Sequence, residues 1–130
     1  MGQQQLLLIL LALIILALAV VAGFWFFQDT AADLNRQAVI IDLRHLASIA
    51  RKHYRTPASI GGGGNTFKNF TVSAHLAENA NGTYQQIDPG HNTDHIHFEG
   101  IGIEKGNDGI NPIRIEARIE IDEIKLEEQN

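Results

Sequence analysis

The sequence predicts an α+β protein in which one long N-terminal helix packs on a small antiparallel β-sheet. Residues 6–27 contain no charged side chain, and an uninterrupted helical pattern runs on from there to Tyr54. Further along the chain the period changes, because apolar and polar residues alternate there as they do on strands with one buried face. We therefore expect a helix over about 6–54, followed by about four strands.

Residues 6–27 form an apolar run of 22 residues, which three glutamines precede. At about 1.5 Å per residue such a helix is about 33 Å long, enough to cross the hydrocarbon core of a bilayer. A secretory signal fits less well, because it needs a basic N-terminal region and a shorter apolar core, although Ala17-Leu18-Ala19 resembles a cleavage site. The run is therefore interpreted as a membrane anchor or as a helix that packs against copies of itself.

The helical pattern continues through residues 29–56, and Pro57 ends it. Apolar residues recur here at spacings of three and four, which is the pattern of one buried helix face. This face consists of Val39, Leu43, Leu46, Ala50 and Tyr54, and an adjoining stripe consists of Leu34, Ala38 and Ile41. The chain therefore divides into an apolar helix half (1–28), an amphipathic helix half (29–56) and a head (57–130).

The head is predicted to be the sheet. Four consecutive glycines at 61–64 have little propensity for helix or strand, and they are interpreted as a flexible linker. After them, apolar residues alternate with polar ones over 70–76, 95–98 and 113–121. Asn81-Gly82 is typical of a hairpin turn, and a phase slip at Asp122-Glu123 predicts a bulged continuation of the last strand. Such a small sheet needs a cover, and the buried helix face is the expected one.

Composition excludes several classes of function. The chain has no cysteine, which rules out disulfides, thiolate metal sites and haem attachment through a CxxCH motif. The head carries five basic and twelve acidic residues, so it is poorly suited to nucleic acid, whose phosphates require clustered Lys and Arg. No nucleophile elbow, P-loop or HExxH motif occurs. We therefore expect neither an enzyme nor a cofactor.

One segment gathers side chains of the kinds that bind metal ions. Within DPGHNTDHIHFEG, the candidate ligands are His91, Asp94, His95 and His97. The last two histidines are two residues apart and share one face of a strand, so both can reach one zinc ion. Because Ile96 and Phe98 define the buried face, the favoured interpretation is an exposed polar strand and no metal site. KGNDGINP likewise suits a calcium loop, but an ordinary turn is the preferred interpretation.

Two further features concern the surface of the protein. Asn69-Phe70-Thr71 and Asn81-Gly82-Thr83 are sequons, so Asn69 and Asn81 are candidates for glycosylation in an exported protein. The aromatic run at 24–27 is typical of side chains that lie at the interface between membrane and water. It is interpreted as an interfacial belt and not as a path for electrons.

The whole layout resembles that of the type IV pilins, a family of bacterial pilus subunits. The shared features are a short leader ending in Gly, about twenty apolar residues, and a long helix that is half bare and half packed on an antiparallel sheet. The resemblance implies cleavage after Gly2, with Gln3 as the new N-terminus. The family usually has a methylated Phe first and a Glu fifth. This chain has Gln3 and Leu7 at these positions if it is cleaved, and Met1 and Gln5 if it is not.

The resemblance also implies a function: a structural subunit of an extracellular, adhesive pilus-like filament, with an inner-membrane-anchored precursor. The implied partners are copies of the chain, the inner membrane before assembly, and the pilus assembly machinery. The residues expected in the filament core are Leu6, Leu10, Leu13, Ala17, Val20 and Phe24. Arg36, Arg44 and Arg51 are expected to lie against acidic sheets of neighbouring subunits. The alternatives are a single-pass anchored interaction domain and a minor pseudopilin of a secretion system.

Overall fold

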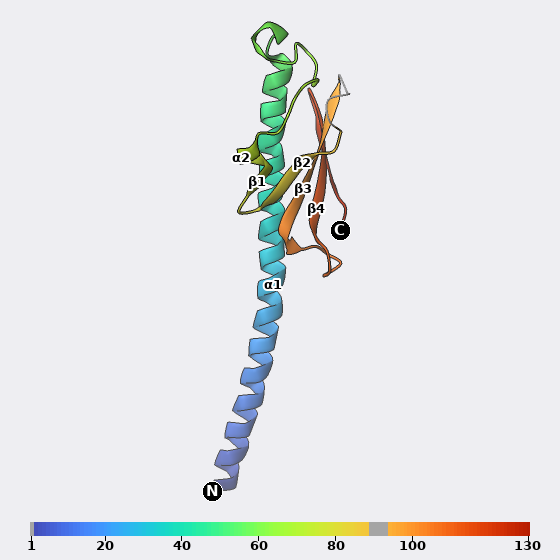
Figure 1. The fold of residues 1–130 in the computed structure, drawn as a ribbon. Helices are drawn as coiled ribbons and strands as arrows, with labels where there is room; N and C mark the ends of the chain where they lie inside the picture. The colour runs from blue at the N-terminus through green and yellow to red at the C-terminus, as the bar shows by residue number, and fades with distance from the viewer. Residues whose placement is uncertain (1, 89–93) are drawn as a thin grey trace.

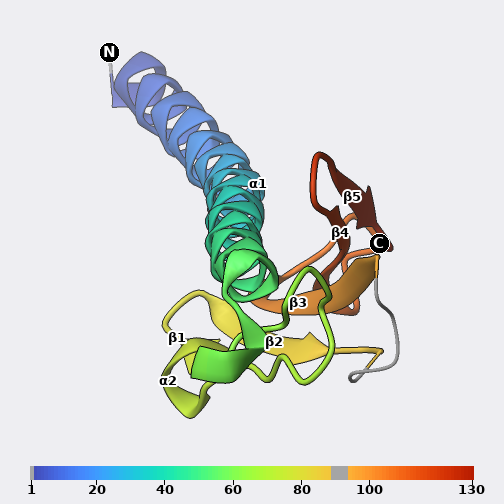
Figure 2. The same ribbon diagram turned by 90° about the horizontal axis from the view of Figure 1, so that it is seen from above.

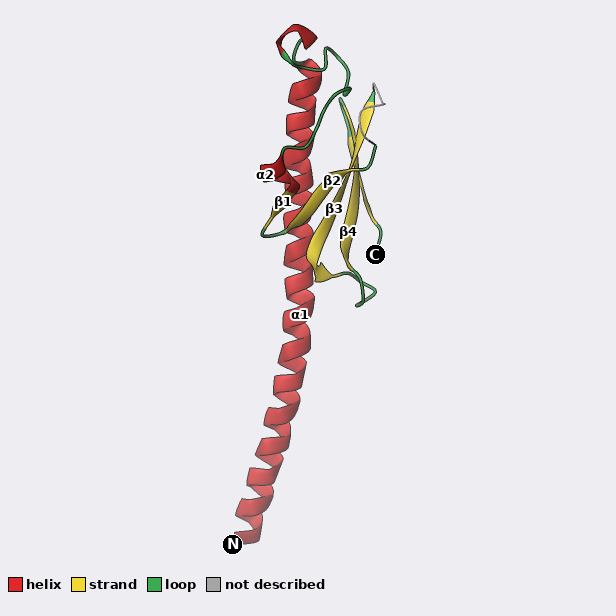
Figure 3. Ribbon diagram, in the orientation of Figure 1, coloured by secondary structure: helices red, strands yellow, loops and turns green. Residues whose placement is uncertain are grey.

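The computed structural model describes residues 2–88 and 94–130. Its first element, α1 (Gly2–Arg55), is one α-helix of 54 residues, about 80 Å long at 1.5 Å per residue. The head packs on the upper half of this helix, and the lower half extends alone (Figures 1 and 3). The predicted helix is confirmed, and its ends lie slightly further out than 6 and 54.

The remaining elements all belong to the head. After α1 come a short 3-10 helix, η1 (Ala58–Ile60), and a four-residue helix, α2 (Ala74–Ala77). The strands are β1 (Glu78–Asn79), β2 (Gly82–Gln86), β3 (His95–Lys105), β4 (Pro112–Glu120) and β5 (Ile124–Glu128). Among the described residues they form one antiparallel sheet in the order β1-β2-β3-β4-β5. The predicted α+β class is therefore confirmed, with five strands in place of about four.

One face of the sheet packs on α1. The predicted helix face is buried, since Val39, Leu43, Leu46 and Ala50 are at most 2% exposed. Alternate residues of β3 and β4 lie against it: Ile96, Phe98, Ile113, Ile115, Ala117 and Ile119. Phe67, Phe70 and Tyr84 complete the same core. The alternation in IRIEARIEI therefore predicted the buried face of β4 correctly as far as Ile119.

Two glycines on β3 let the helix approach the sheet closely. A Cβ atom on Gly100 would lie 2.7 Å from Cγ1 of Val39, and one on Gly102 would lie 2.2 Å from Oδ1 of Asn35. Both distances are shorter than van der Waals contact, so a side chain at either position would push α1 away from the sheet. These glycines therefore set the spacing between the two layers.

Two local predictions were wrong. Residues 70–76 do not form a strand, because the chain turns into α2, where the N–H groups of Leu76 and Ala77 donate to the carbonyl oxygen of Ser73. The phase slip at Asp122-Glu123 is not a bulge. It is the turn of the hairpin between β4 and β5, in which the N–H of Glu120 donates to the carbonyl oxygen of Glu123.

The glycines at 61–64 fold back over the C-terminal end of α1. The N–H of Gly63 donates to the carbonyl oxygen of His53 at 2.8 Å, and that of Gly64 donates to the carbonyl oxygen of Thr56 at 2.9 Å. The last carbonyl groups of a helix have no partner within the helix and need such donors. The segment predicted as a flexible linker therefore also acts as a cap on the helix.

Candidate assembly surface

The lower half of α1 is exposed on all sides. Every residue over 2–30 is exposed, and the large apolar side chains of 6–27 are 50–76% exposed. All the expected core positions lie here: Leu6, Leu10, Leu13, Ala17, Val20 and Phe24. Burial of one such leucine contributes about 1.5–3 kcal/mol, so a continuous patch of this size needs lipid or other helices as a cover.

The helix continues without a break from its apolar half into the half that carries the head. It runs through Gly23, Asp29 and Asp33 as one element. Thr30 donates its hydroxyl to the carbonyl oxygen of Phe26 at 2.9 Å, so this polar group is satisfied within the helix. In the described residues α1 is the one helix that is long and apolar enough to cross a membrane. Gly2 and Gln3, the predicted processing residues, lie exposed in its first turn.

A buried asparagine joins α1 to the sheet just above this junction. Asn35 is 8% exposed, and its Oδ1 accepts hydrogen bonds from the N–H groups of Ile103 at 3.1 Å and Glu104 at 3.2 Å. Its Nδ2 donates to the carbonyl oxygen of Asn81 at 2.8 Å. The two β3 residues lie where the register between β3 and β4 shifts. Asn35 therefore supplies partners for backbone groups at an irregular point of the sheet.

A second polar cluster ties the hairpin of β1 and β2 to α1. Oδ2 of Asp42 accepts hydrogen bonds from Tyr84 Oη at 2.6 Å and from the Nδ2 atoms of Asn79 and Asn81, both at 2.9 Å. Partial burial raises the pKa of Asp42, but these three bonds outweigh it and hold that pKa below its usual value. Burial and the Asp42 carboxylate raise the pKa of Tyr84. The carboxylate is therefore charged at neutral pH and fixes the hairpin.

We expect Asp42 to make the stability of the head depend on pH. A carboxylate with a lowered folded pKa binds fewer protons in the folded state, so its contribution is present above its unfolded pKa of about 4 and is lost as pH falls through the folded pKa. Asp42→Asn removes this charge. The difference in unfolding free energy between the two proteins should be largest at neutral pH and shrink in acid. Urea titrations in detergent over this range measure it, and a difference that does not shrink would contradict the assignment.

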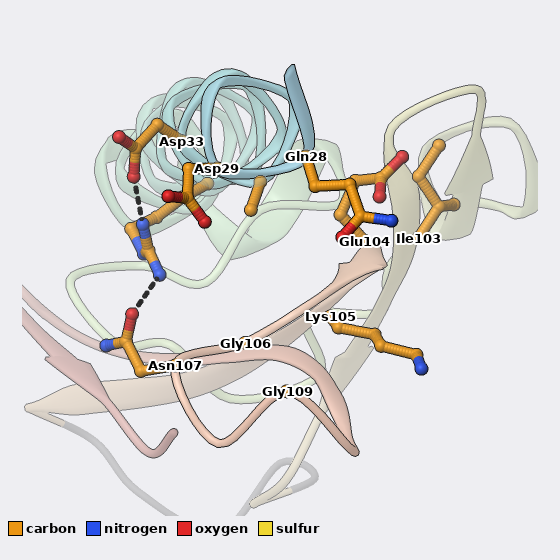
Figure 4. A pocket seen from close by; sticks show the side chains of 11 residues that line it. Gln28, Asp29, Asp33, Ile103, Glu104, Lys105, Gly106, Asn107 and Gly109 are labelled. Carbon is orange, nitrogen blue, oxygen red and sulfur yellow. Dashed lines mark hydrogen bonds and ion pairs between the residues drawn. The ribbon is translucent and has the colours of Figure 1, made fainter. Parts of the chain in front are cut away.

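An open cleft of about 730 Å³ lies at the base of the head, between α1 and the loop from β3 to β4 (Figure 4). Its polar lining residues come from the helix, from the end of β3 and from this loop: Gln28, Asp29, Asp33, Arg36, Glu104, Lys105 and Asn107. Each wall of the cleft carries both signs of charge, with Asp29, Asp33 and Arg36 on the helix and Glu104 and Lys105 on β3. The cleft therefore separates the lowest part of the head from the helix at the point where the apolar half ends.

The arginines of the upper helix contact their own sheet. The guanidinium of Arg36 binds Asp33 Oδ1 at 2.6 Å, Glu128 Oε1 at 2.7 Å and Asn107 Oδ1 at 2.9 Å. Arg51 donates from Nε to the carbonyl oxygen of Glu120 at 3.1 Å. Contact of these two side chains with the sheet of another subunit stays a prediction. Arg44 is exposed, and its expected contact stays a prediction.

His95 and His97 lie on the face of the sheet opposite the buried Ile96 and Phe98, as predicted, but both are half-buried and not fully exposed. Their ring centroids are 5.1 Å apart, and Nδ1 of His97 lies 3.9 Å from Oδ2 of Asp88. Nε2 of His97 is buried and has no hydrogen-bond partner among the described residues. Within residues 2–88 and 94–130, no group of three or more His, Cys, Asp or Glu side chains is placed to hold a metal ion. His91 lies outside the described residues, and Asp94 is exposed just before β3.

We expect chelation to leave the head folded. β3 is held by the buried Ile96 and Phe98 and by backbone pairing with β2 and β4, and these interactions use no histidine ring. Differential scanning fluorimetry with and without EDTA should therefore give the same melting temperature. A fall of more than about 10 °C corresponds to at least about 1 kcal/mol in a small domain. That result would contradict the interpretation and assign His95 and His97 to a structural site.

KGNDGINP forms a turn that its own aspartate closes. Asp108 accepts hydrogen bonds from the N–H groups of Ile110 at 2.9 Å and Asn111 at 3.0 Å, and from Nδ2 of Asn111 at 2.7 Å. These bonds hold the pKa of Asp108 below its usual value. The preferred interpretation as a turn is confirmed.

The two sequons differ in what surrounds their asparagines. Asn69 is exposed and has a φ of 63°, in the turn between Phe67 and Phe70. Asn81 is partly buried, and its Nδ2, the atom to which a glycan is attached, donates to Asp42. A glycan at Asn81 would therefore remove a hydrogen bond of the Asp42 cluster, whereas one at Asn69 would extend into solvent.

Asn35 and Asp42 were not identified from the sequence. Asn35 stands four residues before Val39, on the extension of the buried helix face, and a polar residue at such a position is the signal that was available. Asp42 lies at the edge of the same face and gives no comparable signal. Both residues position the head on the helix.

No protein-family model, curated protein or solved structure matches this chain.

Proposed function

We propose that this chain is the structural subunit of an extracellular filament, which assembles through the apolar half of α1 as a type IV pilus does. The continuity of α1 carries the proposal: one unbroken helix presents the uncovered residues 6–27 and holds the head on its upper half. An anchor alone needs only about 20 apolar residues and no fixed geometry toward its head. A polymer needs an apolar helix and also a fixed geometry between that helix and the head, because each subunit must place its head at a defined position around a shared core.

The apolar half is suited to leave lipid for a core of neighbouring helices. Neither surrounding contains water that could bind a backbone group, and α1 keeps its own backbone hydrogen bonds in both. Residues 6–27 carry no charge, so the packing of several such helices buries no unpaired charged group. In this proposal the precursor is held in the inner membrane, an assembly machinery adds it to the filament, and the heads form the surface that adheres.

A single-pass anchored interaction domain is the second candidate. The length of the apolar run supports it, because 22 residues match the thickness of one bilayer. A minor pseudopilin of a secretion system is the third candidate. It would pack through the same apolar helix as the main subunit of a filament, but it would be a rare subunit of the polymer.

Shearing of the producing cells separates the candidates. The protein is measured in the filaments that sediment from the sheared supernatant and in the membrane fraction. A filament subunit should be the main component of the sedimented material. Recovery only as a detergent-extracted monomer from membranes would support the lone anchor, and a trace amount in filaments built from another protein would support the pseudopilin.

A further inference from the structure

We infer that the cleft at the base of the head binds the headgroup of phosphatidylethanolamine while the chain is anchored in a membrane. The groups that would hold the headgroup are the carboxylates of Asp29 and Glu104 and the ammonium group of Lys105, all of which line the cleft. This inference rests on the membrane-anchored stage of the proposed function, which all three candidates share. It adds a lipid ligand, and a site for that ligand, to this stage.

The cleft begins in the headgroup layer of the membrane. Residues 6–27 match a hydrocarbon core of about 30 Å, and the headgroups add about 5–7 Å on each side. Gln28 and Asp29 follow Phe27 directly, so they lie within about 3 Å of the hydrocarbon boundary. Arg36 is the last helix residue of the lining and lies about 14 Å from that boundary. The lower part of the cleft therefore lies among the headgroups, and its upper part lies just above them.

The head overhangs the membrane on one side of the helix. The sheet and α2 lie to one side of α1 when the molecule is seen from above (Figure 2). The loop between β3 and β4 is the lowest part of the head on that side (Figure 1). A lipid that contacts this side of the apolar half therefore has its headgroup directly below the cleft.

Three charged groups of the cleft have no ion-pair partner among the residues that the structure describes. Arg36 is not one of them, because it binds Asp33 Oδ1 at 2.6 Å. The three are Asp29, Glu104 and Lys105. Asp29 points from α1 into the cleft (Figure 4), and Lys105 is exposed at the end of β3. The cleft therefore offers charged partners to a ligand that carries both a cation and an anion.

Phosphatidylethanolamine has the headgroup that fits these charges. Its ammonium group can donate charge-assisted hydrogen bonds to Asp29 and Glu104, and its phosphate can accept one from Lys105. Phosphatidylcholine carries the same phosphate, but its trimethylammonium group has no N–H to donate. Phosphatidylglycerol has no cation, and the two carboxylates repel its negative charge. The cleft should therefore prefer phosphatidylethanolamine to both.

The size and the lining of the cleft suit one headgroup. Its volume of about 730 Å³ lies within the range of about 300–1,000 Å³ that is typical of sites for small ligands. Ile103 lines the cleft and is 66% exposed, so it offers an apolar contact to the methylene groups between phosphate and ammonium. The headgroup can therefore occupy the cleft while the acyl chains stay beside residues 6–27.

Native mass spectrometry of the full chain released from nanodiscs tests the site. The nanodiscs contain phosphatidylethanolamine, phosphatidylcholine and phosphatidylglycerol in equal amounts, so the three lipids compete at the same concentration. The wild-type chain should carry phosphatidylethanolamine in clear excess over the other two. Asp29→Asn with Glu104→Gln should lower the fraction bound to this lipid about tenfold, because its ammonium group loses its charged partners. A wild-type chain without this preference would overturn the inference.

A matched control removes one Asp and one Glu charge outside the cleft. Glu78 on β1 and Asp122 in the turn between β4 and β5 are both exposed. Asp122→Asn with Glu78→Gln should leave the bound fraction unchanged, whereas Lys105→Gln should lower it, because the phosphate loses its partner. Equal losses in the two double variants would overturn the site. An unchanged fraction in Asp29→Asn with Glu104→Gln would assign the lipid to residues 6–27 and would also overturn it.

Shearing of the producing cells distinguishes this inference from the proposed function. The nanodisc measurement requires only an inserted chain. Preference for phosphatidylethanolamine in a chain that forms no filaments would therefore support the site and contradict the filament. Filaments from a chain without that preference would overturn the site and leave the filament proposal standing. A chain that does not insert into nanodiscs would overturn both.

Discussion

Leu13→Asp should abolish the filaments and leave the head folded. Leu13 lies in the middle of the exposed apolar half. In a helical core the substitution buries one unpaired carboxylate for every subunit, and each ionised group buried without a partner is strongly unfavourable. Insertion into the membrane should survive, because the cost of about 2.5–3.5 kcal/mol for one Asp is smaller than the summed contribution of the remaining apolar residues, at about 0.3–0.6 kcal/mol each.

Electron microscopy of sheared supernatants and fractionation of membranes measure the two effects of Leu13→Asp. Leu13→Ile is the matched control in the core and should assemble, because it conserves volume and polarity. Ile110→Asp adds the same charge to an exposed loop of the head and should also assemble. Filaments of normal number and length from Leu13→Asp would contradict a core made of residues 6–27.

Leu43→Ala should destabilise the head by about 2–5 kcal/mol, whereas Leu34→Ala should change its stability by less than about 0.5 kcal/mol. The two leucines lie on the same helix and undergo the same chemical change. Leu43 is fully buried between α1 and the sheet, and Leu34 is mostly exposed. The predicted loss is a large fraction of the stability of an ordinary small domain, so the first variant should melt at a much lower temperature.

Thermal unfolding in detergent, followed by the near-ultraviolet circular dichroism of the buried Tyr84, measures both variants. Leu34 is 61% exposed and does not belong to the core, so Leu34→Ala removes little packing from the head. Equal melting temperatures for the two variants would contradict the packing of the helix on the sheet.

The helix and the two buried faces could be predicted because their patterns are long. Val39, Leu43, Leu46 and Ala50 repeat over three turns, and four inward residues of β4 alternate without interruption. The pattern at 70–76 is short. There Ser73 precedes the helix-favouring residues of α2, and local propensity outweighed the alternation.

The turn between β4 and β5 shows a second reason for failure. It contains no Gly, Pro or Asn, and Asp122 is its one turn-favouring residue, so its turn signal is weak. Two alternating runs that meet out of phase fit both a bulged strand and a hairpin. The pairing of Ile119 with Ile124 distinguishes the two, and that pairing is a property of the folded chain.

The polar contacts that place the head on the helix could not be predicted, because they join residues far apart in the sequence. Asn35 binds Asn81, Asp42 binds Tyr84, and Arg36 binds Glu128 across the layers of the fold. Periodicity predicts which face a residue lies on, but it does not predict how far the helix is displaced along the sheet. For the same reason the contact of Arg36 with Glu128 of its own sheet could not be predicted.

A three-dimensional reconstruction of the sheared filaments by electron cryo-microscopy tests the central claim most directly. We expect residues 6–27 of many copies to pack against one another along the filament axis, with the heads on the outside. The upper half of each α1 should lie between the core and its own sheet. A filament whose core consists of sheets or of a different protein, with residues 6–27 absent from its axis, would contradict assembly through the apolar helix.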